Sequence, residues 1–357
     1  MNASAGRVAA PAFATFHDAY LAVLEEVVSR PQHAAASRGN TATEVLGMSF
    51  TLTDPRHRIP YLQARRVNIV FNHAEVLWYL AGRDDVAMIG YYAPRLRRLA
   101  SGGRLTGTAY GPRLFHPAGA SQWDRAVDLL RGDPGSKRAV ALIMQPGELA
   151  DPGNPDVACT LGLQFFLREG ALHTVAFMRG NDAWIGLACD VFSFTMIAEY
   201  TAVVLGARLG TYTHMVSSMH LNTPDQAKAR AALVQAHPGL CSAAGAAPVM
   251  PATTTRDTLD VVLDWEQCLR ADQRPLPVHS SELAHLDPYW LQVLGLLEAY
   301  RQIVHHSGPV TGEVMDLLTP PYRWLLAVRW PDRVLPPPAS CATPGLERSV
   351  LGPWDAS

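Results

Sequence analysis

The stretch that decides the fold reads PDVACTLGLQFFLR over residues 155–168, EG at 169–170 and ALHTVAFMR over 171–179. Two apolar segments of strand length, Leu161–Leu167 and Ala171–Arg179, flank the turn signal Glu169-Gly170. This pattern predicts a β-hairpin. A cysteine, an arginine and two aspartates are gathered around it: Cys159, Arg179, Asp182 and Asp190.

The rest of the chain alternates between helical and strand patterns. The apolar segment Val191–Leu205 is too long for a strand and predicts a buried helix. Further helices are expected at 13–28, 72–80, 123–131, 225–236, 259–270 and 287–306, and strands at 44–52, 139–144 and 211–221. Loops or irregular segments are expected at 37–41 and 83–105, with a flexible insertion at 237–256 and a Pro-rich tail over 331–357. We therefore predict one α/β domain over residues 1–330, with a large mixed sheet flanked by helices.

Composition gives no sign of a nucleic-acid or membrane partner, and the cysteines suit a reducing compartment. The chain has 357 residues, 48% of them apolar, and a net charge of −2, which gives no footprint for nucleic acid or for an anionic membrane. Its five cysteines form no CxxC pair, and the N-terminus shows no signal-peptide pattern. Val191–Leu205 is short for a membrane span and contains Glu199. We expect a cytoplasmic protein without a metal site.

Three spacings give the chain a family resemblance. They are Cys-x4-Gln ending at Gln164, Arg-x2-Asp beginning at Arg179, and Gly-x3-Asp-Val beginning at Gly186. Together they resemble the centre of the thymidylate synthase superfamily, and the likeness extends over residues 38–222. The resemblance implies that Cys159 attacks a pyrimidine ring, because a thiolate adds readily and is easily expelled. The alternative for a single cysteine is a small buried apolar residue.

The resemblance also assigns roles to the surrounding residues. It implies catalytic roles for Glu75, which orders water, and for Tyr110, which lies near the reacting carbon. It implies nucleotide binding by Arg38, Lys137, Arg138, Gln164, Arg179, Gly180, Asn181, His220 and Asn222. It implies contacts to 5,10-methylenetetrahydrofolate, the one-carbon co-substrate, by Asp182, Ile185 and Gly186. Lys137 and Arg138 would serve the phosphate site of a partner subunit, which implies a homodimer with the two sheets packed together.

The residue at position 190 indicates which pyrimidine base the protein binds. Thymidylate synthases carry Asn at this place, whereas the deoxycytidylate hydroxymethylases carry Asp. A carboxylate accepts a hydrogen bond from the 4-amino group of cytosine and can share a proton with ring N3. The alternative is that Asp190 is only the N-cap of the following helix.

Other departures from the family concern the sugar and the folate. Lys137 stands for Arg, Gly180 for Ser and Asn222 for Tyr, a combination that resembles the CMP 5-hydroxymethylase branch of nucleoside antibiotic (mildiomycin) biosynthesis. Tyr91-Tyr92 replaces the tryptophans that contact folate, and the C-terminus differs from the family's closing segment, which favours access by water. We therefore predict transfer of a hydroxymethyl group to C5 of CMP. The alternatives are a dCMP 5-hydroxymethylase and a nucleotide-binding relative that has lost catalysis.

Overall fold

The computed structural model describes residues 9–37, 39–115, 121–236 and 247–334. The chain divides into two compact units, one of residues 1–60 and 120–227 and the other of residues 61–119 and 228–357. The single catalytic domain over residues 1–330 stays a prediction. Arg38, residues 237–246 of the expected insertion and residues 335–357 of the tail lie outside the described residues.

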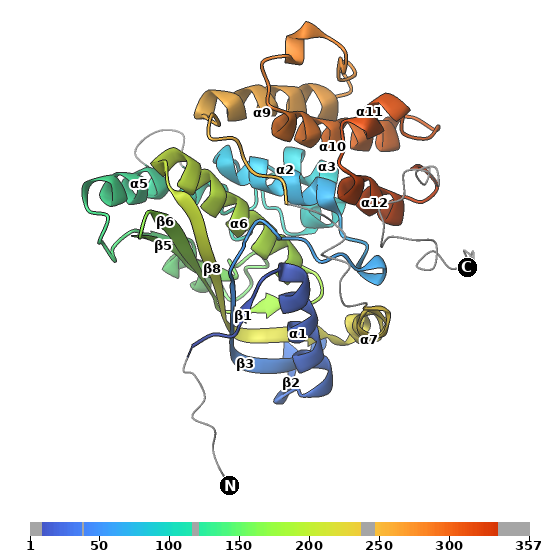
Figure 1. Cartoon of the computed structure of the whole chain (residues 1–357). Helices are drawn as coiled ribbons and strands as arrows, with labels where there is room; N and C mark the ends of the chain where they lie inside the picture. Colours follow the sequence, from blue (N-terminus) through green and yellow to red (C-terminus); the bar gives the residue numbers. More distant parts are fainter. Residues whose placement is uncertain (1–8, 38, 116–120, 237–246, 335–357) are drawn as a thin grey trace. The chain divides into compact units, whose positions relative to one another are not determined.

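A large mixed sheet forms the first unit (Figure 1). Its strands follow the order β1-β3-β8-β6-β5-β4, with β2 paired to β3 and β7 paired to β8. The strands are β1 (Ala12–Phe13), β2 (His33–Ser37), β3 (Asn40–Leu52), β4 (Val140–Leu142), β5 (Thr160–Arg168), β6 (Ala171–Met178), β7 (Asn181–Asp182) and β8 (Arg208–Asn222). The α/β class and the mixed sheet flanked by helices are therefore confirmed. The prediction of a polar loop at 37–41 is wrong in extent, because β2 and β3 extend into this segment and pair there.

The central hairpin forms as predicted. β5 and β6 pair antiparallel from Thr160↔Met178 to Arg168↔Ala171. The turn residues Glu169 and Gly170 have φ values of 52° and 70°, as a two-residue hairpin turn of the primed type requires. Because Thr160 is paired with Met178, the residue that precedes β5 lies beside the residue that follows β6.

Helices α1 (Phe16–Ser29), α5 (Gln122–Gly132) and α6 (Gly186–Leu205) pack against the sheet. The covered face is the core of the unit, where Phe16 of α1 stacks on Phe50 of β3. Successive side chains of a strand point to opposite faces. β8 buries Tyr212, His214 and Val216 at alternating positions, whereas nearer its end Met219 and Leu221 are buried and Ser218, His220 and Asn222 are partly exposed.

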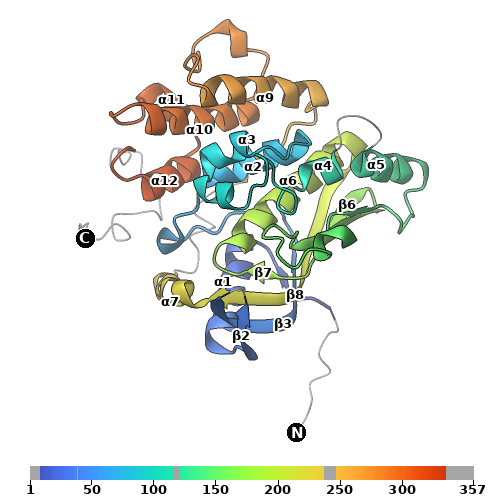
Figure 2. The same cartoon turned by 180° about the vertical axis from the view of Figure 1, so that it is seen from behind.

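α6 is the core helix of this unit, and it begins five residues before the apolar segment that predicted it. Its length and hydropathy are sufficient for a membrane span, but 78% of the relevant window is buried inside the protein. Burial of this kind is usual for the central helix of a folded core. Figure 2 shows β7 beside β8, next to the start of α6.

The second unit is helical. Its helices are α2 (Ile69–Leu80), α3 (Val86–Tyr92), α4 (Gly111–Leu114), α9 (Arg256–Arg270), α10 (Pro288–His305), α11 (Gly312–Asp316) and α12 (Pro320–Arg329), and α7 (Gln226–Gln235) follows β8. All twelve residues of α2 are buried. The prediction of an irregular segment at 83–105 is wrong in part, because this segment contains α3. The missed signal was Asp85, whose side chain caps the helix by accepting from Met88 N.

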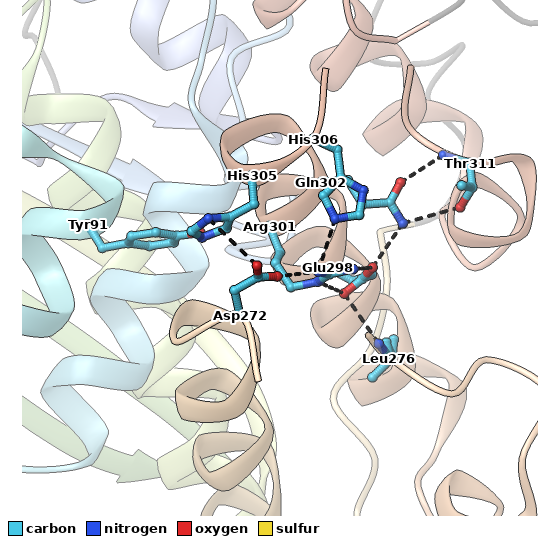
Figure 3. Close-up of polar contacts among 9 residues, drawn as sticks. All are labelled: Tyr91, Asp272, Leu276, Glu298, Arg301, Gln302, His305, His306 and Thr311. Atoms are coloured by element: carbon cyan, nitrogen blue, oxygen red, sulfur yellow. Dashed lines mark hydrogen bonds and ion pairs between the residues drawn. The ribbon is translucent and has the colours of Figure 1, made fainter. Parts of the chain in front are cut away.

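Figure 3 shows the polar network that holds α10 in this unit. Arg301 donates to both oxygens of the buried Glu298 at 2.8 Å and also bonds Asp272, just beyond the end of α9. Tyr91 of α3 bonds His305 at 3.2 Å, and Tyr92 donates to Glu266 at 2.9 Å. The two tyrosines that replace the family tryptophans are thus engaged in packing and hydrogen bonding within the unit.

Candidate active site

Cys159 lies at the entrance to β5, where the hairpin register places it beside Arg179. The main-chain N–H of Arg179 donates to the Cys159 carbonyl at 2.9 Å. The thiol is partly exposed. The nucleophile expected from the sequence is therefore held by the sheet and accessible to a ligand.

Arg179 fixes the loop before Cys159 and places a positive charge at its sulfur. Nε donates to the Ala158 carbonyl at 2.9 Å, and Nη2 lies 3.1 Å from the Val157 carbonyl and 3.7 Å from Cys159 Sγ. Within the described ranges Nη1 has no hydrogen bond, so two of the five guanidinium N–H donors remain for a substrate anion. A cation at this distance stabilises a thiolate.

Glu148 supports the same loop and was not among the residues expected from the sequence. It is 8% exposed, and its two oxygens accept from Ala158 N at 2.6 Å and from Gln145 N at 2.8 Å. The only local signal was the pair Gln145 and Glu148, spaced as a capping box. Arg179 and Glu148 therefore both form hydrogen bonds with the loop that precedes Cys159, and together they fix its position.

Asp190 is not the N-cap of α6, so the alternative reading of this residue is wrong. The helix begins at Gly186, and Asp190 lies one turn further on the same face. The N-cap position belongs to Ile185, and Asp182 lies in the turn before it, where its Oδ1 accepts from Trp184 N at 2.9 Å and Ile185 N at 2.6 Å. The Asp190 carboxylate accepts from Asn181 Nδ2 at 2.7 Å.

The surroundings of Asp190 favour its protonated form. Burial raises the pKa of Asp190 to about 7, the hydrogen bond from Asn181 opposes this rise, and the negative charge of Asp182 adds to it. A carboxyl group that titrates near neutral pH can give or take a proton during a reaction. This property suits a proton-sharing role towards a pyrimidine ring.

The remaining expected residues of the first unit gather along β7 and β8. Asp182 is paired with His220, and Gly180 immediately precedes β7. Asn222 Nδ2 donates to Asp182 Oδ2, so two residues assigned to different ligands are bonded to each other. Gly180 has room for a side chain, since a Cβ there would meet no atom closer than the Ser218 carbonyl at 3.7 Å.

Lys137 and Arg138 lie exposed just before β4. Gln164 of β5 donates to the Lys137 carbonyl at 2.8 Å, and this contact fixes the basic segment at the edge of the sheet. Glu75 and Tyr110 lie in the second unit, where Glu75 is 6% exposed and Tyr110 stacks on Tyr79 with ring centroids 5.2 Å apart. Their roles at Cys159 stay predictions.

Asp182 leaves room for the folate contact assigned to it. A carboxylate offers about four acceptor positions, of which Trp184, Ile185 and Asn222 use three. One position remains for a donor on a pterin ring. Among the residues that the structure describes, no group of three or more His, Cys, Asp or Glu side chains is arranged to hold a metal ion.

The raised pKa of Asp190 makes a stability prediction. The folded state holds this proton up to about pH 7, whereas the unfolded chain releases it near 3.8, the ordinary pKa of an aspartate. Wild-type stability should therefore fall as pH rises through this window, and Asp190→Asn should abolish that loss. Between pH 5 and 8 the variant should gain about 1–3 kcal/mol relative to wild type in urea unfolding. Asp128→Asn, at a 73% exposed side chain, is the control; equal pH profiles for all three proteins would contradict the assignment.

Comparison with known proteins assigns the family. The thymidylate synthase family model matches residues 18–241, which is more than half of the chain. The chain is 30% identical over 220 residues to the deoxyuridylate hydroxymethyltransferase of Bacillus phage SP01 and 28% identical over 195 residues to that of Delftia phage PhiW-14. These matches cover 58% and 51% of this chain, and 57% and 54% of the phage proteins. A thymidylate synthase of Symbiobacterium thermophilum is 28% identical over 193 residues, 49% of this chain and 67% of that protein. The chain belongs to the thymidylate synthase family.

Proposed function

We propose that the protein is a CMP 5-hydroxymethylase. It would transfer a one-carbon unit from 5,10-methylenetetrahydrofolate to C5 of CMP and add water, giving 5-hydroxymethyl-CMP and tetrahydrofolate. The observation that carries this proposal is the protonatable carboxyl of Asp190, bonded to Asn181 and connected along the chain to the Arg179–Cys159 pair.

Cys159 supplies the covalent step in this proposal. Its thiolate adds to ring C6, and this addition makes C5 nucleophilic enough to take up the one-carbon unit that the folate provides. Loss of the C5 proton releases tetrahydrofolate and leaves a methylene group on C5, water adds to that carbon, and expulsion of the thiolate then restores the aromatic ring. Arg179 favours the thiolate, and its unused N–H groups are suited to a phosphate oxygen.

Asp190 is the basis for choosing cytosine. As Cys159 adds to C6, negative charge develops on the ring and reaches N3. A carboxyl group with a pKa of about 7 can donate its proton there and accept from the 4-amino group with its second oxygen. An amide at this position cannot transfer a proton in the same way.

The sugar assignment rests on Asn222 and Gly180. The Asn222 amide is bonded to Asp182, so it does not extend into the ribose site as a tyrosine would. Gly180 provides no hydroxyl for the phosphate. We propose that the nucleotide shifts towards these two residues and that the added space accommodates a 2′-hydroxyl, which favours CMP over dCMP and agrees with a role in nucleoside antibiotic biosynthesis.

A second candidate is a uracil nucleotide. Two of the relatives are named deoxyuridylate hydroxymethyltransferases, and each is about as similar to this chain as the thymidylate synthase is. A third candidate is a nucleotide-binding protein without turnover, suggested by Tyr91 and Tyr92 being engaged within their own helical unit.

Competition among CMP, dCMP, UMP and dUMP in one reaction separates these candidates. With methylenetetrahydrofolate present, mass spectrometry of the products should show 5-hydroxymethyl-CMP first. Asp190→Asn should lower the cytosine-to-uracil ratio of kcat/KM by roughly tenfold to a hundredfold, the equivalent of one lost charged hydrogen bond. Cys159→Ala should form no product while it still binds nucleotide. A wild-type preference for dUMP would reject the cytosine assignment, and no product from any nucleotide would favour a binding protein.

The open face of the sheet supports a homodimer. The register places Leu142, Gly162, Phe177 and Met215 in one row across four strands, on the face opposite the helices. Leu142 is 58% exposed, Met215 41% and Val140 40%, a large apolar exposure for one sheet face. We propose that a second copy covers this face and that Lys137 and Arg138 reach the partner's phosphate site.

Subunit mixing tests this shared site. Arg138→Ala and Cys159→Ala should each be inactive, but an equal mixture after subunit exchange should recover about a quarter of wild-type activity. The reason is that half the dimers are hybrids and each hybrid has one intact site. Leu142→Glu in both chains should prevent dimerisation and abolish the recovery. Continued inactivity of the mixture, with exchange demonstrated by native mass spectrometry, would reject a shared site.

A further inference from the structure

A row of hydrogen bonds leads from the core to Asp190. Tyr212 Oη lies 2.7 Å from His214 Nδ1, His214 Nε2 lies 3.3 Å from Asn181 Oδ1, and Asn181 Nδ2 lies 2.7 Å from Asp190 Oδ2. Tyr212 and His214 are 0% exposed and Asn181 is 3% exposed. Water does not reach these groups, so their donors and acceptors must match one another.

Only one assignment of donors and acceptors fits all the hydrogen bonds of the row. Burial lowers the pKa of His214 to about 3, so the ring is neutral and carries a single N–H. Burial, followed by the charge of Asp190, raises the pKa of Tyr212, so its hydroxyl keeps its proton. Among the described residues that hydroxyl has no acceptor other than His214 Nδ1. The ring N–H therefore lies on Nε2 and donates to Asn181 Oδ1, and the Asn181 NH₂ group faces Asp190.

The surroundings hold this arrangement in place. His214 stacks on Phe50, with ring centroids 5.3 Å apart, which fixes the plane of the imidazole. A Cβ on Gly186 would lie 3.1 Å from Asn181 Nδ2, so the absence of a side chain at Gly186 gives the amide its space. The charged group that faces Asp190 from β7 is Asp182, and its oxygens are bonded to Trp184, Ile185 and Asn222.

This assignment of donors and acceptors decides which oxygen of Asp190 carries the proton. Oδ2 accepts from Asn181, so a proton on Asp190 resides on Oδ1. This matters because a carboxylic acid can pair with either pyrimidine. With O–H at N3 and C=O at the 4-amino group it pairs with cytosine; with C=O at the N3–H and O–H at O4 it pairs with uracil.

We propose that Tyr212, His214 and Asn181 are positioning residues that confine the Asp190 proton to Oδ1, that Oδ1 is the oxygen presented to ring N3 of the bound base, and that Asp190 thereby selects cytosine. We call these three residues the relay. The inference rests on the proposed function, since it explains how one carboxyl group distinguishes two bases that it could otherwise both bind. Tyr212 and His214 act through Asn181 and Asp190 and do not need to touch the substrate.

Breaking the relay at His214 tests it. His214→Phe keeps an aromatic ring against Phe50 but removes the donor to Asn181, so the amide can turn and the Asp190 proton can occupy either oxygen. The cytosine-to-uracil ratio of kcat/KM should fall by about threefold to tenfold, the range of one neutral hydrogen bond. In the ligand-free protein the Asp190 carboxyl, followed by ¹³C NMR and assigned with Asp190→Asn, should titrate about one unit higher, because its stabilising donor is no longer fixed.

Two further variants make the result decisive. Tyr212→Phe removes one hydroxyl and should shift both readouts in the same direction by less, and it is the test variant if His214→Phe does not fold. Val216→Ala reduces packing on the same face of β8 outside the relay and should leave both readouts unchanged. The proposal is overturned if neither relay variant changes the ratio or the titration, or if Val216→Ala changes them equally. If the wild-type protein converts no pyrimidine nucleotide, the proposed function fails, and the NMR titration alone decides whether the relay controls Asp190.

Discussion

The hydrogen bond from Asn181 to Asp190 joins the two parts of the site that the sheet and the helix supply separately. Asn181 belongs to β7, which is held in parallel register against β8, and Asp190 belongs to the start of α6. Gly186 lies one turn before Asp190 and leaves space for the amide. The raised pKa of Asp190 is a consequence of this packing, because the carboxyl group is partly withdrawn from water and has only a neutral donor to stabilise its charge.

Cys159 depends on the same section of chain. Residues 179–182 leave β6, provide Arg179 to the cysteine loop, and then continue as β7 to Asn181 and Asp182. A displacement of this segment would change the charge at the sulfur and the hydrogen bond at Asp190 together. The spacing Arg-x2-Asp therefore has a geometric meaning, since it connects the arginine beside the nucleophile to the aspartate that fixes the turn before α6.

Much of this site could be predicted from the sequence, because its residues are close together along the chain. The hairpin register places Cys159 beside Arg179, and helical spacing places Gly186 beneath Asp190. The role of Asp190 as a helix cap was excluded only by the structure, in which α6 begins at Gly186 and Ile185 is its N-cap. Tyr212 and His214 were missed because they lie some thirty residues beyond Asn181, and no local pattern connects them. The available signal was that Tyr212 and His214 alternate with other residues on one predicted strand and therefore share a face. Glu148 was missed because its capping-box spacing with Gln145 does not reveal its hydrogen bond to Ala158, and α3 was missed because the cap at Asp85 was overlooked.

The central claim is that Cys159 attacks a cytosine ring that Asp190 has selected, and a mechanism-based trap tests it directly. A 5-fluoro nucleotide has no removable proton at C5, so the covalent enzyme complex accumulates once the one-carbon unit has been added. With methylenetetrahydrofolate present, intact mass spectrometry and peptide mapping should find 5-fluoro-CMP bonded to Cys159, and 5-fluoro-UMP should react far less. A preferential adduct with 5-fluoro-UMP, or an adduct on any residue other than Cys159, would contradict the account.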